Sequence, residues 1–179
     1  MIVFVRHGEA AAGWGDHPDP GLSDKGWTQA EKVAETLEAL NIQHVFSSPM
    51  QRCQETASAF AKRTGSSVRI EPNVSEIPTP PNTPDRVTWL RTLMSGDWDG
   101  SEDIVLDWRN NLLRCIEALP DHSVVFSHFV AINALVGHLE GTDAVMVFRP
   151  DHCSTTILET SPTGLILQQR GAEAGTNVL

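Results

Sequence analysis

The sequence has little positive charge and few cysteines. It contains 13 lysine and arginine residues against 23 aspartate and glutamate residues, a formal net charge of −10 over 179 residues. Such an acidic chain argues against nucleic acid or an anionic membrane surface as its partner. The cysteines are widely spaced and form no CxxC pair, so we expect neither a disulfide framework nor a cysteine metal site; they are Cys53, Cys115 and Cys153.

Long hydrophobic runs are also missing. The apolar stretch that follows Met1 is too short for the hydrophobic region of a secretion signal. The longest apolar stretch, VVFSHFVAINALVGHL, is interrupted by His128, Asn133 and His138, and we do not expect it to span a bilayer. We therefore expect a cytoplasmic protein with reduced thiols and no membrane partner.

Strand-like and helix-like patterns alternate along a chain that has the length of one domain. Apolar runs rich in β-branched residues predict strands, and apolar positions that recur along one face predict helices. This alternation, with right-handed crossovers, predicts an α/β fold: a three-layer α/β/α sandwich with a mostly parallel central sheet. The expected strands are 2–5, 44–48, 67–70 and 123–127, with a terminal hairpin of 154–159 and 164–169; the expected helices are 27–40, 49–63, 85–94, 103–119 and 129–139.

Local signals suggest where two of these helices begin. Thr28 and Glu31 have the spacing of a capping box at the start of the first helix. Ser48 is expected to cap the second helix, with Pro49 as its first residue. We expect one domain over residues 1–170, with the proline-rich stretch 72–100 as a partial lid, and a frayed tail over 171–179.

Basic side chains cluster at the ends of predicted strands. Arg6 and His7 end the first strand, Arg52 falls in the first turn of the helix after the second, and His128 directly follows a third. Ligands of open α/β sheets bind beyond the carboxyl ends of the strands, so these side chains can converge. Two guanidinium groups suit a dianionic phosphoryl group, and neutral imidazole can attack phosphorus. Gly8 would let the backbone approach that group closely.

The motifs RHGE, LSDKGWTQA, FSSPMQRCQETA, SEIP and VVFSHFVAINALVG, in this order, resemble the histidine phosphatase superfamily, the phosphoglycerate-mutase-like group. The resemblance covers nearly the whole chain and implies a phosphoglycerate-mutase-like fold. It implies that His7 is the nucleophile that becomes phosphorylated. Arg6, Arg52 and His128 would hold the phosphoryl oxygens, and Glu76 would protonate the leaving oxygen. The resemblance implies no metal and no cofactor.

Other interpretations stay open for several residues. Arg52 can instead pair with Glu55, three positions along the helix surface. Glu9 can support the loop through hydrogen bonds or be solvated. Phe129 stands where the family often has glycine after its second histidine, and its side chain is expected to narrow or line the pocket. The remaining histidines lack a convergent context and are expected on the surface or in loops: His17, His44, His122, His138 and His152.

Three functions fit this pattern. The leading one is a phosphatase that acts on a small phosphorylated substrate or a phosphoprotein, including phosphohistidine. A phosphoglycerate-type mutase and a non-catalytic binder of phosphorylated ligands are the alternatives. The interval from Arg52 to His128 is 76 residues (128 − 52), which leaves room for a partial lid only. A mutase must keep water from its intermediate, so the short interval favours the phosphatase. Residues 10–21 and 72–100 are expected to set specificity.

Overall fold

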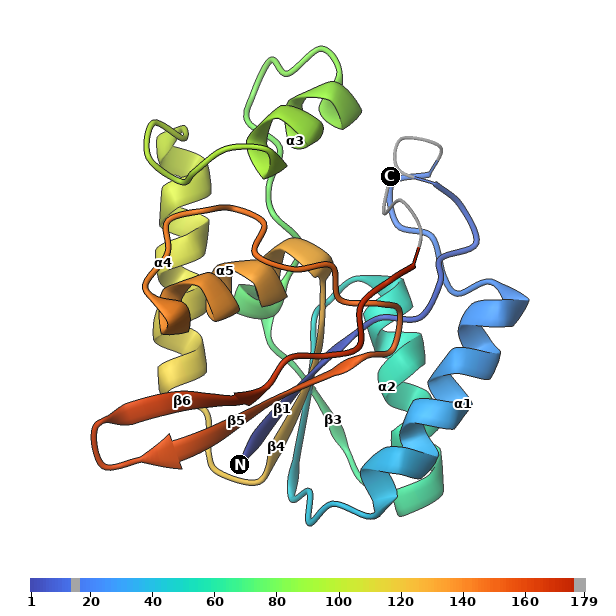
Figure 1. Ribbon diagram of the computed structural model, residues 1–179. Helices are drawn as coiled ribbons and strands as arrows, with labels where there is room; N and C mark the ends of the chain where they lie inside the picture. Colours follow the sequence, from blue (N-terminus) through green and yellow to red (C-terminus); the bar gives the residue numbers. More distant parts are fainter. Residues whose placement is uncertain (14–16, 176–179) are drawn as a thin grey trace.

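The computed structural model of the protein describes residues 1–13 and 17–175. Its centre is a six-stranded sheet with the order β3-β2-β4-β1-β5-β6 (Figure 1). The first four strands in this order run parallel, and β5 and β6 form an antiparallel hairpin beside β1. The predicted mostly parallel sheet is therefore confirmed. The strands are β1 (Ile2–Arg6), β2 (His44–Ser47), β3 (Val68–Ile70), β4 (Ser123–Ser127), β5 (Thr155–Ser161) and β6 (Gly164–Gln169).

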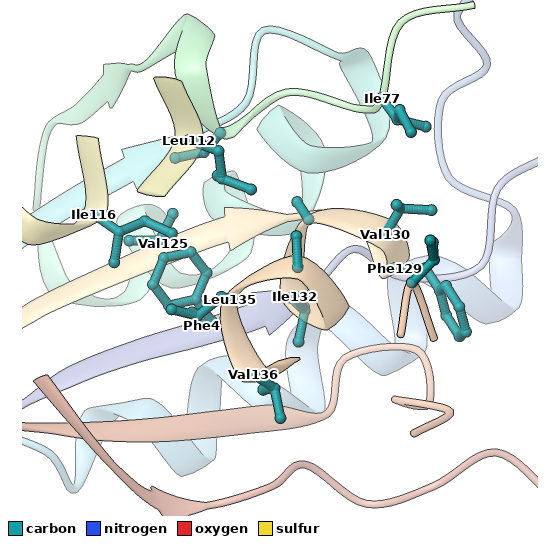
Figure 2. Close-up of a cluster of buried hydrophobic side chains, with 14 of the residues drawn as sticks. Phe4, Ile77, Leu112, Ile116, Val125, Phe129, Val130, Ile132, Leu135 and Val136 are labelled. Carbon is teal, nitrogen blue, oxygen red and sulfur yellow. The ribbon is translucent and has the colours of Figure 1, made fainter. Parts of the chain in front are cut away.

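Helices cover both faces of the sheet (Figure 1). Val3 and Val5 of β1 join the core beneath α1 and α2, whereas Ile2 and Phe4 join the core beneath α4 and α5. Successive side chains of a strand point to opposite faces, which is why one apolar strand serves both cores. Figure 2 shows the second core, where Phe4 lies close to Leu135 of α5. The helices are α1 (Asp24–Glu38), α2 (Gln51–Thr64), α3 (Arg86–Met94), α4 (Asp103–Glu117) and α5 (Phe129–Glu140), with a short 3₁₀ helix η1 (Pro72–Val74).

The first helix begins earlier than its apolar pattern predicts. Ser23 is the N-cap, and its hydroxyl oxygen accepts a hydrogen bond from the Gly26 amide. The predicted capping box at Thr28 is wrong, because Thr28 lies inside α1 and its hydroxyl donates to the Asp24 carbonyl. The polar first turn of α1 faces solvent, so the hydrophobic pattern starts only after it.

The second helix begins later than predicted. Met50 is its N-cap and Gln51 its first residue, so the expected cap at Ser48 is wrong. The Ser48 amide donates to the Phe126 carbonyl, which keeps Ser48 in register with β4 and outside the helix. Its hydroxyl oxygen accepts from the Met50 amide. The turn between β2 and α2 is therefore longer, and it places the next side chains of α2 above the carboxyl end of the sheet.

The segment after β6 is paired rather than frayed. The Asp151 amide donates to the Ala172 carbonyl and the Ala174 amide donates to the Arg149 carbonyl, each at 2.8 Å. Glu173 forms a β-bridge with Pro150. The expected frayed tail is therefore wrong for residues 171–174, and residues 176–179 lie outside the described part of the chain. This pairing fixes the loop that precedes β5.

The stretch between β3 and α4 rises above one side of the sheet and carries α3 (Figure 1). Leu90 and Met94 of α3 and Trp98 after it are buried in the core cluster, so the stretch is anchored to the body of the protein. In the part of the chain that the structure describes, no helix combines the length and the apolarity needed to cross a membrane.

Candidate active site

The two histidines predicted to converge lie side by side at the carboxyl end of the sheet. Arg6 of β1 is in register with Ser127 of β4, and the His7 amide donates to the Ser127 carbonyl at 3.0 Å. The rings of His7 and His128 therefore meet edge to face with their centroids 5.3 Å apart. Parallel pairing of β1 with β4 is what joins positions 121 residues apart in the sequence.

His7 is held as a neutral imidazole with a defined tautomer. Its Nδ1 lies 2.7 Å from the Gly8 carbonyl oxygen, which can only accept, so Nδ1 carries the proton. Its Nε2 accepts a hydrogen bond from Arg52 Nε at 3.1 Å. Burial, and then the nearby His128 and Arg52, lower the pKa of His7 well below its usual value. Its Nε2 lone pair therefore faces the cations of the site, where it can attack an electrophile.

Arg52 points into the site and not toward Glu55. Besides His7, its guanidinium lies 3.2 Å from His128 Nδ1 and 3.5 Å from Glu76 Oε2. Glu55 instead accepts from the Leu22 amide and from Gln51 on the same helix. The guanidinium is buried at the start of α2, where the helix N-terminus adds favourable potential for an anion.

Arg6 is buried beside His7 and is held on two sides. One terminal nitrogen donates to the Pro150 carbonyl at 2.9 Å, and the other lies 3.1 Å from His152 Nε2. Its Nε has no hydrogen-bond partner within the described residues. Burial lowers the pKa of Arg6 to about 10, so the group stays charged at neutral pH. Phe129 lies beneath the guanidinium, 5.2 Å from it, and packs in the core instead of narrowing or lining the cavity as expected.

His128 is fully buried and also neutral. Its Nδ1 faces the Arg52 guanidinium, which only donates, so its Nε2 carries the proton and donates to Ser48 Oγ at 2.7 Å. Burial, and then Arg52, lower its pKa well below the usual value. The Cys53 sulfur lies 3.4 Å from the same Nε2, and burial raises the pKa of this thiol above its usual range, as expected for a packing residue.

Glu76 lies beside Arg52 and His128, on the segment between η1 and α3. Its Oε2 is 3.6 Å from His128 Nδ1, and its Oε1 accepts from the Ile77 amide. The carboxylate is 8% exposed, which leaves it reachable from the cavity while it is held against Arg52. A carboxyl group in this place can exchange a proton with a ligand bound between the arginines and the histidines.

Gly8 and Glu9 connect the loop after β1 to the start of α1. The Gly8 amide donates to Thr56 Oγ1, and a Cβ on Gly8 would lie 2.6 Å from the Gly26 carbonyl oxygen. The expected approach of the Gly8 backbone to phosphate is therefore not seen, and the glycine is needed for contact with α1. Glu9 accepts from Ser23 and Lys25, whose hydrogen bonds lower its pKa, so it links this loop to the start of α1.

The sequence reasoning missed His152. It was expected on the surface or in a loop, outside the site. It does lie in the loop before β5, but its ring is 6.0 Å from that of His7 and its Nε2 accepts from Arg6. Burial, and then Arg6, lower its pKa to about 4, so the ring is neutral at pH 7. No local pattern marks this role, because His152 reaches Arg6 through the pairing of β5 with β1. The remaining histidines named above lie outside this cluster of rings, although His17 lines the cavity.

Asp19, in the loop between β1 and α1, was also missed. Its carboxylate accepts from the Gln51 amide at 2.9 Å and lies 3.9 Å from an Arg52 nitrogen. It therefore caps the start of α2 beside the site. Residues 14–16 of the same loop, which was expected to set specificity, lie outside the described part of the chain.

One cavity of about 860 Å³ opens over the site. Arg6, His7, Arg52, Glu76 and His152 line it from the sheet side, and α3 closes part of the opposite side. Ligand pockets usually measure about 300–1,000 Å³. The arrangement can hold an anion against a neutral imidazole nucleophile.

The first half of the chain has a recognised family pattern. Residues 2–80 match the model of the histidine phosphatase superfamily (branch 1). This part of the chain therefore resembles the superfamily. The matched residues include Arg6, His7, Arg52 and Glu76, and His128 joins them through β4.

Known proteins similar to this chain include a probable mutase and phosphatases. A probable phosphoglycerate mutase GpmB of Enterobacter sp. (strain 638) is 29% identical over 168 residues, which cover 80% of this chain and 76% of the relative. Among solved structures, phosphoserine phosphatase from Entamoeba histolytica in complex with 3-phosphoglyceric acid has a TM-score of 0.75, 20% identity and 96% coverage of both chains. A mycobacterial glucosyl-3-phosphoglycerate phosphatase with inorganic phosphate has a TM-score of 0.76, 21% identity and coverage of 98% and 99%. At these identities the two structures show the shared fold.

Proposed function

We propose that this protein is a histidine phosphatase that hydrolyses phosphomonoesters, or phosphohistidine on a protein, through a phosphorylated His7. The observation that carries the proposal is the tautomer of His7. Its Nδ1 proton is held by the Gly8 carbonyl, and the lone pair of Nε2 accepts a hydrogen bond from Arg52, which a bound phosphate can take over. Arg6, Arg52 and His128 surround the same point and would hold the phosphoryl oxygens, where preorganised charge stabilises the transition state.

The first step transfers the phosphoryl group to the enzyme. A bound phosphate takes over the hydrogen bonds that Arg52 now makes to the two histidines. His7 Nε2 attacks phosphorus, the new N–P bond forms, and the ester P–O bond breaks. Glu76 supplies the proton that the leaving oxygen needs, since its carboxyl group lines the cavity beside Arg52 and His128.

The second step releases the phosphate. Glu76, now ionised, removes a proton from a water molecule as the water oxygen attacks phosphorus. The N–P bond breaks, and its electron pair returns to His7 Nε2. Inorganic phosphate leaves and Glu76 is protonated again for the next turnover, so the same carboxyl serves as acid and then as base.

We expect phosphate release and not isomerisation from phosphoglycerates. A mutase must hold its intermediate away from water. In this chain the part between β3 and α4 supplies one nine-residue helix, α3, as cover. Incubation of the purified protein with 3-phosphoglycerate, followed by phosphate assay and ³¹P NMR, should give inorganic phosphate or no reaction. Rapid formation of 2-phosphoglycerate with little free phosphate would show that the mutase reading is right.

A non-catalytic binder of phosphorylated ligands is the third possibility. It has no need of a neutral nucleophile together with a carboxyl group in the same cavity. Release of nitrophenol from p-nitrophenyl phosphate separates the two readings, since a binder would retain the ester unchanged.

His152 is expected to act as a positioning residue for Arg6. Replacing it with alanine removes the acceptor at 3.1 Å and should lower kcat/KM for p-nitrophenyl phosphate about tenfold, since a hydrogen bond to a charged group contributes about 1.5–3 kcal/mol. His152→Gln restores an acceptor and should recover much of the loss. His44→Ala, at the exposed start of β2, is the control. An unchanged kcat/KM in His152→Ala would show that His152 does not position Arg6.

A further inference from the structure

His128 faces the phosphoryl site with the ring nitrogen that carries no proton. In the proposed mechanism a bound phosphate displaces the Arg52 guanidinium from His128 Nδ1. The lone pair of Nδ1 then meets the lone pairs of a phosphate oxygen, and neither atom has a proton to donate. His128 is fully buried, and a buried acceptor without a donor costs free energy. Nδ1 therefore needs a proton before His128 can hold a phosphoryl oxygen.

The other ring nitrogen keeps its proton, because neither of its neighbours is a base. Ser48 Oγ lies 2.7 Å from His128 Nε2, and the Cys53 sulfur lies 3.4 Å from it. The Cys53 thiol donates to the Ser127 carbonyl, and burial raises its pKa above the usual range, so it stays protonated. A serine hydroxyl and a protonated thiol can accept a hydrogen bond from Nε2 but do not remove its proton at neutral pH.

Ser48 is held in place as the acceptor of this hydrogen bond. Its side chain is fully buried, and its amide donates to the Phe126 carbonyl. Its Oγ also accepts from the Met50 amide at 3.2 Å, so the start of α2 fixes the position of the hydroxyl oxygen. A hydroxyl oxygen has two acceptor positions, which the Met50 amide and His128 fill. Nδ1 is thus the nitrogen of His128 on which a proton can be gained or lost.

The charges around His128 favour a protonated ring once a phosphomonoester is bound. Without a ligand, burial and then the Arg52 guanidinium lower the pKa of His128. A dianion bound beside the arginines opposes these cations, and so does ionised Glu76, whose Oε2 lies 3.6 Å from Nδ1. The charged and titratable groups that act on the ring come from β1, α2, α3 and the residues around them: Arg6, His7, Arg52, Cys53, Glu76 and Arg86.

We propose that Ser48 is a positioning residue that holds the Nε2 proton of His128, so that His128 takes a second proton from the phosphoryl group on Nδ1 and binds that group as an imidazolium. This inference rests on the proposed phosphatase activity. The ester enters as its monoanion, which is present near neutral pH because the second pKa of phosphomonoesters is about 6. Its O–H bond breaks, the Nδ1–H bond forms, and the resulting dianion accepts a hydrogen bond from Nδ1. The proton returns to the inorganic phosphate when it leaves.

Nitrogen NMR of protein labelled with ¹⁵N-histidine measures this protonation state, with inorganic phosphate as the probe. At pH 7 without phosphate, His128 should carry a proton on Nε2 alone. With saturating phosphate, both of its nitrogens should carry a proton. The spectrum of His128→Gln identifies the signals. A His128 ring that stays neutral in the phosphate-bound wild type would overturn the inference, and this measurement needs no Ser48 variant.

Ser48→Ala tests the role of the hydroxyl. A hydrogen bond to a charged group contributes about 1.5–3 kcal/mol, so without it the pKa of the phosphate-bound ring should fall by about one unit or more. The kcat/KM for p-nitrophenyl phosphate should fall about tenfold for the same reason. The matched control is Ser47→Ala, which removes an equally buried hydroxyl that donates to the Ser48 carbonyl. It should change neither value.

The remaining outcomes separate this inference from the proposed function. Wild-type values in Ser48→Ala, or equal losses in Ser48→Ala and Ser47→Ala, would overturn the role of Ser48 and leave the phosphatase in place. If phosphate protonates His128 but the wild type releases no phosphate from p-nitrophenyl phosphate or from a phosphohistidine protein, the proposed function is overturned while the binding step stands.

Discussion

Replacing His7 with alanine is expected to abolish phosphate release from p-nitrophenyl phosphate, with a loss on the order of 10⁴-fold or more, as for removal of a catalytic nucleophile. The reason is chemical: the variant lacks the neutral imidazole whose Nε2 lone pair lies beside Arg52 at the edge of the cavity. Initial rates of nitrophenol release measure the loss. Circular dichroism and thermal unfolding of the variant check that the sheet remains folded.

The same substitution should remove a covalent intermediate. Brief mixing of the wild type with a ³²P-labelled phosphomonoester, followed by denaturation, should leave label on the protein that is labile in acid and stable in alkali. His7→Ala should carry no such label, whereas His44→Ala should retain it. Full turnover by His7→Ala, or a label that persists in it, would assign the nucleophile to another residue.

Replacing Glu76 with glutamine should have the second largest effect, and the effect should depend on the leaving group. General acid catalysis contributes about 10²–10⁴-fold where the leaving oxygen needs a proton. An alkyl phosphate needs this proton, whereas nitrophenolate leaves without it. We therefore expect Glu76→Gln to slow an alkyl phosphate by about 10²-fold or more and p-nitrophenyl phosphate much less, as measured by kcat/KM for both esters.

The matched control is Glu71→Gln, which alters a carboxylate that caps η1 five residues earlier. It should slow neither ester. Equal slowing of both esters in Glu76→Gln would indicate that Glu76 acts electrostatically or structurally and does not protonate the leaving oxygen. If neither ester were slowed, the proton would be transferred by another carboxylate of the cavity, such as Glu9.

The convergence of the main site residues was predictable from the sequence. His7 and His128 each follow an apolar strand, and parallel strands bring their carboxyl ends to one edge of the sheet. Arg52 lies in the first turn of α2, the helix that follows β2, which again places it at that edge. These predictions needed only the type and the order of the elements, and strongly apolar strands give both.

Other features were not predictable, because they depend on contacts between distant segments. His152 reaches Arg6 only because β5 runs antiparallel to β1 and the segment after β6 holds the preceding loop. The need for Gly8 comes from its contact with Gly26, and a Cβ on Gly26 would lie 2.1 Å from the Glu9 carbonyl oxygen. No periodicity in the sequence encodes either contact.

The pairing of residues 171–174 with the loop before β5 determines when the site can form during synthesis of the chain. Ala172 and Ala174 are added more than 160 residues after Arg6 and His7. At about 5–20 residues per second, Arg6 and His7 wait roughly ten to thirty seconds for the segment that fixes the loop carrying His152. A nascent chain that has not reached that point lacks the pairing that holds His152 on Arg6, so the site should form only after residues 171–174 have left the ribosome.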